Sequence, residues 1–404
     1  MTVVTRPEVF STDPYTYTPA ELKARDRELT LLEKATIDYA ETSFPLLLVV
    51  SGRKASGKTI TLVRFVKTQT EKNGGKIRLY LLRPESTMRD ALATCELFSG
   101  CDVPRTLSSA VHFLAEQVKS LKLGKICIFI DDAQRYAWSD VNDALRFFFE
   151  HGASRILPAL VFNIPIEEMK SRIQLDVQSR YAWGSGGTIP IGFHAYNYED
   201  MYHILLQRAE EGLQPKTWTE GAITEATTHG ISVGDVRQAI SMLRAAAEQT
   251  PKNGRLGTEE MRAALDAGNI LTLIEDVNNL TIADRLYLLS IALQYVKDPK
   301  AKDRGVSTAP VDEAYERICH TLKVAPMSSR STRWLMRVRL QDEAEMIANE
   351  YYSKMMHSTS GQSQRGRSTI MKLKPNPKLL LKALSKADWG SFIQHDAFAK
   401  LFKL

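Results

Sequence analysis

The stretch "FPLLLVVSGRKASGKTI", residues 44–60, decides the fold of the first half of the chain. An apolar run leads directly into Gly52, four further residues, and then Gly57-Lys58-Thr59. This is the spacing of a loop whose backbone N–H groups surround phosphates, and glycine is needed where a side chain would collide with the ligand. A helix that starts near Lys58 would direct its positive N-terminal dipole at the same anion. We therefore predict a buried strand, a phosphate-binding loop and a helix.

The loop predicts ATP or ADP, together with Mg²⁺, as the cofactors. Lys58 supplies a positive charge to the terminal phosphates, and Thr59 supplies a hydroxyl group as a metal ligand. The residues expected to contact the nucleotide here are Gly52, Arg53, Lys54, Ala55, Ser56, Gly57, Lys58, Thr59 and Ile60.

A second strand ending in acids completes the expected site. In "KICIFIDDAQ", residues 125–134, Asp131 is placed to act on the metal through water, and Asp132 to polarise the attacking water. The second acid is usually Glu in ATPases of this kind. Asp is one methylene shorter, and a misplacement of about 1 Å can cost roughly 10²-fold in rate. Asn163 closes another apolar run and can orient water near the γ-phosphate. The pattern indicates a slow ATPase that uses its nucleotide as a switch.

The distribution of apolar residues predicts three domains. Short runs at 46–51, 77–82, 126–131 and 157–163 alternate with helical patterns, which is typical of a parallel sheet with helices on both faces. From about residue 197 to 268 only helical periodicity is present. The region from about 275 indicates a winged helix, since it has three helical patterns, the basic Gly/Ser loop 357–369 and the alternating "IMKLK". We predict a nucleotide-binding domain at 1–195, an all-α lid at 196–270 and a winged-helix DNA-binding domain at 271–404.

Charge and composition limit the partners. The chain of 404 residues has a net charge of +6, but residues 351–404 hold ten Lys and Arg against two acids. This basic end suggests a polyanionic partner, and a solvated basic surface is the alternative. No apolar run approaches the roughly 20 residues of a membrane span, so no membrane partner is expected. The four cysteines form no C-x-x-C pair, which favours an intracellular protein.

With these motifs in hand, the sequence resembles the archaeal replication initiators over nearly its whole length. These are AAA+ ATPases related to origin recognition complex subunit one and to the cell-division-control loader protein. "HGISVGDVRQAISMLRAA", residues 229–246, is similar to the family's second sensor helix. The resemblance implies that its Arg237 reaches the γ-phosphate from the lid. "DPYTYTPAELKARDREL", residues 13–29, looks like the segment that packs around the adenine, which implies contacts from Tyr17, Pro19, Leu22 and Arg25.

The C-terminal motifs point to duplex DNA. "SSRSTRWLMRVR", residues 328–339, is the candidate for insertion in the major groove, and the family's wing corresponds to "QRGRSTIMKLK", residues 364–374. A family insertion that meets DNA corresponds to "CDVPRTLSS", residues 101–109. The candidate DNA contacts are Arg330, Arg333 and Arg337 in the helix, Arg365 and Arg367 in the wing, and Arg105 and Thr106 in the insertion.

The resemblance implies an ATP-dependent protein that binds duplex DNA at a replication origin and helps recruit the replicative helicase or other initiator subunits. The implied location is the cytoplasm, in association with the nucleoid. One departure concerns the arginine finger, because Arg180 stands about two positions from the family's place for it. Two alternatives remain: an ATPase of the transposition or clamp-loader type that remodels a protein partner, and a nucleotide-regulated transcriptional DNA-binding paralogue.

Overall fold

The computed structural model describes residues 2–42, 44–72, 77–85, 87–102, 104–120, 124–152, 155–298, 300–327, 337, 340–341, 346–356 and 364–389. The chain divides into two compact units, Met1–Arg262 and Ala263–Leu404, and each is described by itself.

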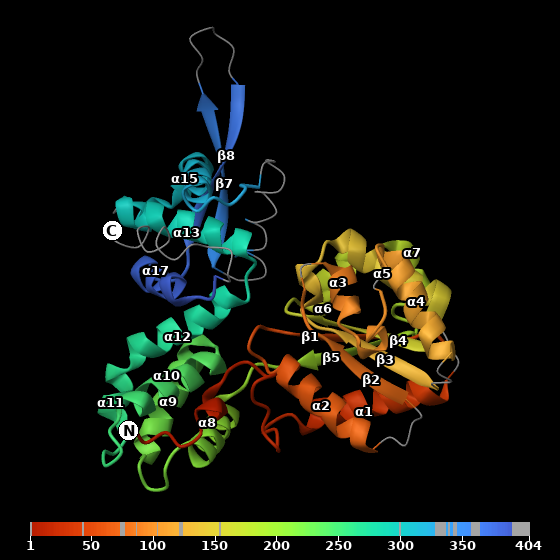
Figure 1. Ribbon diagram of the computed structural model, residues 1–404, viewed down its shortest axis with the longest axis horizontal. Coiled ribbons are helices and arrows are strands. Elements are labelled where there is room, and N and C mark those ends of the chain that lie inside the picture. The colour runs from red at the N-terminus through yellow and green to blue at the C-terminus, as the bar shows by residue number, and fades with distance from the viewer. Residues whose placement is uncertain are drawn as a thin grey trace. The chain divides into compact units, whose positions relative to one another are not determined.

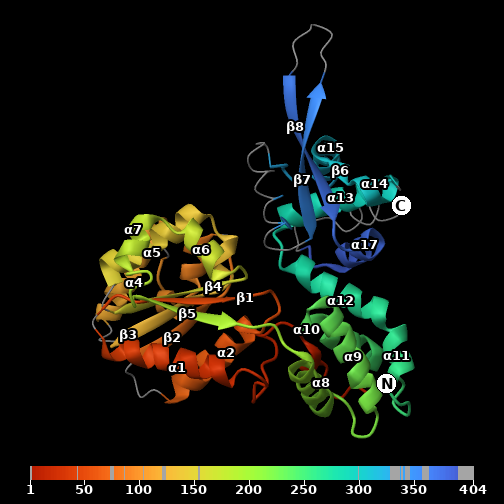
Figure 2. The ribbon, with the colours of Figure 1, turned by 180° about the vertical axis from the view of Figure 1, so that it is seen from behind.

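The first unit contains a five-stranded parallel sheet in the order β2-β3-β4-β1-β5 (Figures 1 and 2). Its strands are β1 (Leu47–Gly52), β2 (Ile77–Leu82), β3 (Lys125–Ile130), β4 (Ile156–Phe162) and β5 (Thr188–Phe193). The first four coincide closely with the apolar runs, because strands buried on both faces need continuous rather than alternating hydrophobicity. Every residue of β4 is buried, as its central place in the sheet requires. The predicted parallel sheet is confirmed.

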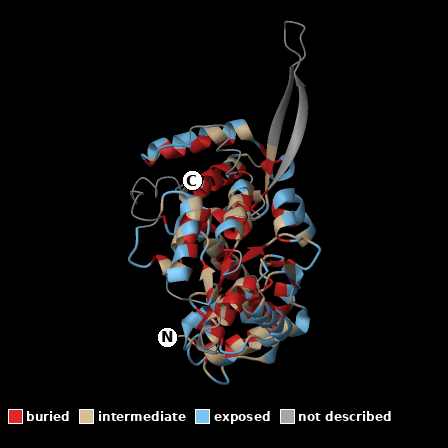
Figure 3. Cartoon of the chain, turned by 90° about the vertical axis from the view of Figure 1, so that its right-hand side faces the viewer, coloured by how far each residue is buried: buried red, intermediate tan, exposed pale blue. Residues whose placement is uncertain are grey.

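Helices cover both faces of this sheet (Figure 1). One apolar layer joins the sheet to α1 and α2, and another joins it to the five helices from α3 to α7 inclusive. Figure 3 shows the buried residues gathered between these layers and the exposed ones on the outer helix faces. The helices are α1 (Asp26–Glu41), α2 (Lys58–Lys72), α3 (Met88–Ala93), α4 (Leu107–Ser120), α5 (Trp138–Gly152), α6 (Ile166–Arg172) and α7 (Leu175–Arg180).

Strand order determines where the polar motifs meet. β4 lies between β1 and β3, and all three run in the same direction. The residues that follow their carboxyl ends therefore lie at one edge of the sheet. These are the phosphate loop after β1, Asp131 and Asp132 after β3, and Asn163 after β4.

The rest of the first unit is helical, as predicted for the lid. It contains α8 (Tyr198–Gly212), α9 (Glu220–Val233), α10 (Val236–Gln249) and α11 (Thr258–Ala263). Side-chain caps fix the starts of three of these helices: Asn197 for α8, Thr219 for α9 and Asp235 for α10. Each cap oxygen accepts a backbone N–H that the helix itself cannot satisfy.

The second unit combines helices with a three-stranded sheet in the order β6-β8-β7. Its core is built on α13, in which eleven of sixteen residues are buried. The elements are α12 (Leu265–Asn278), α13 (Ile282–Lys297), α14 (Ala301–Arg304), β6 (Val306–Ser307), α15 (Thr308–Thr321), β7 (Ile347–Met356), β8 (Gln364–Leu373) and α17 (Pro377–Lys386). Helices followed by an antiparallel hairpin agree with the predicted winged helix. The predicted boundary between the lid and the winged-helix domain, at 270/271, falls inside α12. The division into three domains stays a prediction.

Two local expectations were wrong. Residues 357–369 were expected to be a loop, but β8 already begins at Gln364 and pairs with β7 in antiparallel register, with Ser353 opposite Arg367. The polar composition of residues 297–308 likewise predicts a loop, but this stretch contains the short helix α14 and strand β6. In both places Gly, Ser and charged residues hide a strand that depends on pairing with a distant segment.

Candidate functional site

The phosphate loop lies between β1 and α2, as the spacing predicts. A Cβ atom at Gly52 would come within 2.5 Å of the backbone oxygen of Phe193 on β5. Gly57 has a φ of +83°, and a Cβ atom there would lie 2.1 Å from the hydroxyl of Tyr196. Both positions require glycine in this fold, independently of any ligand. Ala55 also has a positive φ, +63°, so the loop is held in a conformation that ordinary residues rarely adopt.

Lys58 is held inside this loop. Its side chain is 5% exposed, and its ammonium donates hydrogen bonds of 2.9 Å to the carbonyl oxygens of Gly52 and of Arg53. Burial lowers the pKa of Lys58 to about 8, and the charges of Asp132 and Asp131 oppose that shift. The loop thus holds a positive charge beside the strand ends that carry the acids.

Asp131 and Thr59, the predicted metal ligands, are brought together. Asp131 is 3% exposed, and its carboxylate accepts a hydrogen bond from the Thr59 side chain. Burial, followed by the charge of Asp132, raises the pKa of Asp131 to about 7, while Thr59 and Lys58 lower it. A hydroxyl beside a carboxylate fits Mg²⁺, which is usually bound by one or two protein oxygens plus phosphates and water. Among the described residues, no cluster of three or more His, Cys, Asp or Glu offers a fuller metal cage.

Asp132 contacts Asn163, so the two predicted water-handling residues also meet. The Asn163 amide nitrogen donates to Asp132 Oδ1 at 2.7 Å. Gln134, which sequence reasoning missed, donates to the same oxygen at 3.2 Å. Its place two residues after Asp132 was the available signal.

Arg237, the predicted sensor, lies at the start of α10 and pairs with Asp235. Its Nε donates to Asp235 Oδ1 at 3.1 Å, and its Nη2 donates to Asp235 Oδ2. The Arg237 charge lowers the pKa of Lys58, so the guanidinium lies within electrostatic range of the phosphate loop. Contact with a phosphate would require rearrangement of the Asp235 pair.

Arg25, one of the four residues expected around the adenine, is hydrogen-bonded to the phosphate loop. Its Nη2 donates to the carbonyl oxygens of Ser56 at 2.7 Å and His194 at 3.0 Å. Its guanidinium lies 3.9 Å from the ring centre of Tyr196, another residue that sequence reasoning missed. Arg25 therefore ties the loop after β1 to the segment after β5.

The other three residues expected around the adenine are Tyr17, Pro19 and Leu22. Tyr17 is buried, its hydroxyl donates to Glu211 on α8, and the Arg208 guanidinium lies 4.3 Å from its ring centre. Pro19 is buried and Leu22 is half-buried. Tyr17 thus packs on the helical part of the unit, and the predicted adenine contacts stay predictions.

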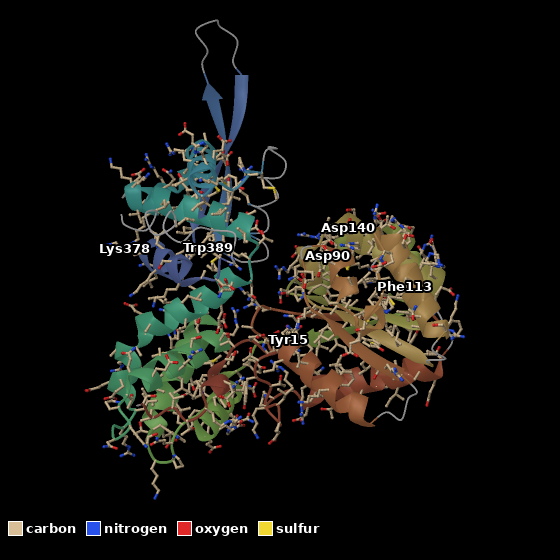
Figure 4. All side chains as sticks on the ribbon, in the orientation of Figure 1. Tyr15, Asp90, Phe113, Asp140, Lys378 and Trp389 are labelled. Carbon is tan, nitrogen blue, oxygen red and sulfur yellow. The ribbon has the colours of Figure 1, made fainter. Side chains whose placement is uncertain are left out.

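Tyr15, two residues before Tyr17, is a further polar residue near the acids. Figure 4 labels it on the N-terminal segment. Arg83 lies 4.2 Å from its ring centre, and within the described chain its buried hydroxyl has no hydrogen-bond partner. Burial and then the charge of Asp131 raise the pKa of the Tyr15 hydroxyl. No motif in the sequence marks this residue.

Arg180, near the expected finger position, is engaged within its own unit. Its guanidinium forms salt bridges with Glu150 at 3.2 Å and Asp176 at 4.0 Å, and it lies 5.5 Å from the Phe149 ring centre. A guanidinium held by two acids is poorly placed to act on a neighbour's nucleotide.

The structure corrects one predicted DNA contact. Arg337 is 8% exposed and donates to the Tyr287 hydroxyl at 3.0 Å, with Asp312 3.8 Å away. Tyr287 and Asp312 are distant in sequence, so their hold on Arg337 could not be read from the basic helix pattern. Arg337 is a core residue of the second unit rather than a surface residue facing DNA.

The other DNA candidates stay predictions. Arg330 and Arg333 lie outside the described residues, and Arg365 and Arg367 lie in strand β8 rather than in a loop. Arg105 is exposed. The Thr106 hydroxyl accepts the backbone N–H of Ser109 at the start of α4, a local helix-capping role.

No helix in the described part of the chain is long and apolar enough to cross a membrane.

Comparisons with known proteins agree with this architecture. The chain is 25% identical over 328 residues to an ORC1-type DNA replication protein of Desulfurococcus amylolyticus, covering 78% of this chain and 80% of that protein. The Aeropyrum pernix ORC1 protein, solved in complex with DNA, matches with a TM-score of 0.68 at 19% identity and covers 98% of both chains. The Aeropyrum pernix ORC2 protein, solved as ADPNP-ADP complexes, matches with a TM-score of 0.53 at 18% identity over 95% of this chain and 98% of that chain.

No protein-family model matches the chain. The curated relatives nevertheless confirm the predicted resemblance to archaeal replication initiators. The structural likeness confirms the AAA+ fold with a C-terminal winged helix.

Proposed function

We propose that this chain, which resembles the archaeal ORC1-type DNA replication proteins, is an ATP-controlled replication initiator that binds duplex DNA. One observation supports the nucleotide-binding part of this proposal. Three adjacent parallel strands bring together Lys58, Thr59, Asp131, Asp132 and Asn163. Phosphate, metal and attacking water each have a matching group there. The fold shared with an ORC1 protein solved in complex with DNA supports the proposed binding of duplex DNA.

In the proposed reaction the chain's own residues position the groups. Lys58 would hold the terminal phosphates, and Thr59 and Asp131 would hold Mg²⁺, which would neutralise negative charge on those phosphates. Asp132 accepts the proton of the attacking water, Asn163 orients that water, and Arg237 reads the γ-phosphate. Recruitment of the replicative helicase or of other initiator subunits is the further step that the resemblance suggests.

The experiment that tests this function is chromatin immunoprecipitation coupled to sequencing, with the parent chain and the Lys58→Ala variant. Peaks at replication starts, weakened in the variant, are expected. Peaks at scattered promoters would instead support the transcriptional alternative. Strong partner-stimulated turnover with DNA affinity independent of nucleotide would support the remodelling ATPase.

We propose further that hydrolysis is slow. Asp132 is shorter than the usual Glu, and Arg180 is tied to Glu150 and Asp176. An arginine finger can be worth about 10³ to 10⁵ in rate, so its absence would leave a nucleotide switch rather than a motor.

Asp132→Glu is expected to raise single-turnover ATP hydrolysis about 10- to 100-fold, because the added methylene carries the carboxylate about 1 Å closer to the water. The measurement is quenched-flow with excess enzyme. Asp140→Glu, the same change on α5, is the matched control and should leave the rate unchanged. An unaltered rate in Asp132→Glu would show that the short acid does not limit hydrolysis.

Raising the pH from 7 to 9 is expected to weaken Mg²⁺-free ATP binding at least about tenfold. Burial lowers the pKa of Lys58 to about 8, so its ammonium is largely protonated at pH 7 and largely neutral at pH 9. Each pH unit above that pKa costs about a factor of ten in the competent form. Asp131, with a pKa of about 7, gains negative charge over the same pH range, and this charge also lowers the affinity for Mg²⁺-free ATP.

Equilibrium titration with a fluorescent ATP analogue measures this dependence. In Lys58→Arg the guanidinium stays charged, so most of the fall above pH 8 should disappear. A parent affinity that is constant between pH 7 and 9 would argue against Lys58 as the phosphate ligand.

A further inference from the structure

Gln134 closes a ring of hydrogen bonds around Asp132. Its amide nitrogen donates to Asp132 Oδ1 at 3.2 Å, and its amide oxygen accepts the backbone N–H of Asn163 at 3.1 Å. The Asn163 side chain donates to the same Asp132 oxygen at 2.7 Å. We call the side chains of Asp132, Gln134 and Asn163, with the Asn163 backbone N–H, the acid–amide ring.

The backbone is shaped to form this ring. Asp132 has φ +47° and ψ +43°, a left-handed conformation that a non-glycine residue rarely adopts. The chain turns there from β3 into the single 3₁₀ turn Ala133–Arg135, which carries Gln134. Asn163 follows the neighbouring strand β4, so the ring joins the ends of two paired strands. Backbone strain of this kind gathers at functional sites.

The ring determines which carboxylate oxygen can act. A carboxylate oxygen has about two lone-pair positions, and the two amide donors fill both on Oδ1. The other oxygen, Oδ2, is left to accept a proton from water, and rotation of the carboxylate about the Cβ–Cγ bond is restrained. The charge of Asp132, ahead of that of Asp131, opposes the lowering of the Lys58 pKa by burial, so the restrained carboxylate lies within electrostatic range of the phosphate loop.

We propose that Gln134 is the positioning residue for Asp132 in ATP hydrolysis. The carboxylate of an Asp sits farther back than that of a Glu, and rotation about its Cβ–Cγ bond decides which oxygen it presents to the water, so a restraint on that rotation favours the productive orientation. Gln134 provides that restraint and links it to Asn163, so that the acid and the water-orienting amide move as one unit. This inference rests on the ATPase activity proposed above.

The test compares two substitutions of Gln134 in the full chain with Mg²⁺-ATP. Gln134→Met keeps the side-chain length and removes both hydrogen bonds, whereas Gln134→Glu keeps the oxygen that accepts from Asn163 and loses the donor to Asp132. Both are expected to lower kcat about 10- to 100-fold with KM and ATP affinity unchanged, since neither touches the phosphates. Gln117→Met on α4 is the matched control and should keep the parent kcat.

A double-mutant cycle separates positioning from packing. If Gln134 and Asn163 act as a unit, the Gln134→Met/Asn163→Ala double variant should lose no more than about twofold beyond the worse single variant. Full multiplication of the two effects, or a Gln134→Met enzyme with the parent kcat, would overturn the inference and leave the ATPase proposal intact. A parent chain that binds Mg²⁺-ATP and never hydrolyses it would overturn both.

Discussion

Lys58→Ala is expected to weaken ATP binding about 100-fold, which corresponds to about 2.7 kcal/mol. Lys58 is 5% exposed, and the carbonyl oxygens of Gly52 and Arg53 hold its ammonium at the start of the helix that should face the phosphates. A charged hydrogen bond formed away from water is worth about 1.5–3 kcal/mol, so its removal alone accounts for most of the loss.

The same substitution is not expected to lower the melting temperature of the protein without nucleotide. Burial lowers the pKa of Lys58, so the protonated side chain is less stable in the fold than in water at pH 7. Below a pH of about 8 the side chain is charged in both states and opposes folding. Its removal relieves that cost and offsets the two lost hydrogen bonds.

Thermal denaturation with and without Mg²⁺-ATP measures both effects. A ligand at 100 times its dissociation constant stabilises the parent by about 2.7 kcal/mol, and this increment should nearly vanish in Lys58→Ala. Lys67→Ala, on the exposed face of the same helix, should keep it in full. A ligand-dependent rise of parent size in Lys58→Ala would refute the assignment of the phosphate loop.

The nucleotide site could be predicted because its signals are local. Gly52, Gly57 and Lys58 are fixed by a spacing of a few residues, and Asp131 follows an apolar run directly. Parallel strands put their carboxyl ends at one edge, so four recognised strands were enough to bring Asp132 and Asn163 together.

The missed features depend on partners far away in the sequence. Arg337 reads as one basic residue among several, and only its contact with Tyr287, fifty positions earlier, places it in the core. Arg367 stands in a Gly/Ser-rich stretch, and only pairing with Ser353 makes that stretch a strand. Gln134 has no recognised motif, because its role comes from the turn at Asp132 and from Asn163 on the next strand.

Replacing Arg365 and Arg367 with Ala is expected to flatten the salt dependence of DNA binding by about 1.8 in the slope of log affinity against log salt. Each phosphate contact releases condensed counterions and contributes about −0.9 to that slope for duplex DNA. Between 50 and 200 mM salt the parent should therefore lose about 12-fold more affinity than the double variant.

Fluorescence anisotropy with a short labelled duplex measures this effect in the full chain, and the double variant should weaken all sequences alike, because phosphate contacts carry no sequence information. Arg27→Ala/Arg255→Ala removes the same charge from two exposed positions of the first unit and should keep the parent slope. Arg330→Ala or Arg333→Ala should instead relax the preference among sequences, as expected for contacts to base edges. If the wing variant keeps the full slope while the parent binds DNA, Arg365 and Arg367 make no phosphate contact. Other basic side chains among residues 351–404 must then contact the duplex.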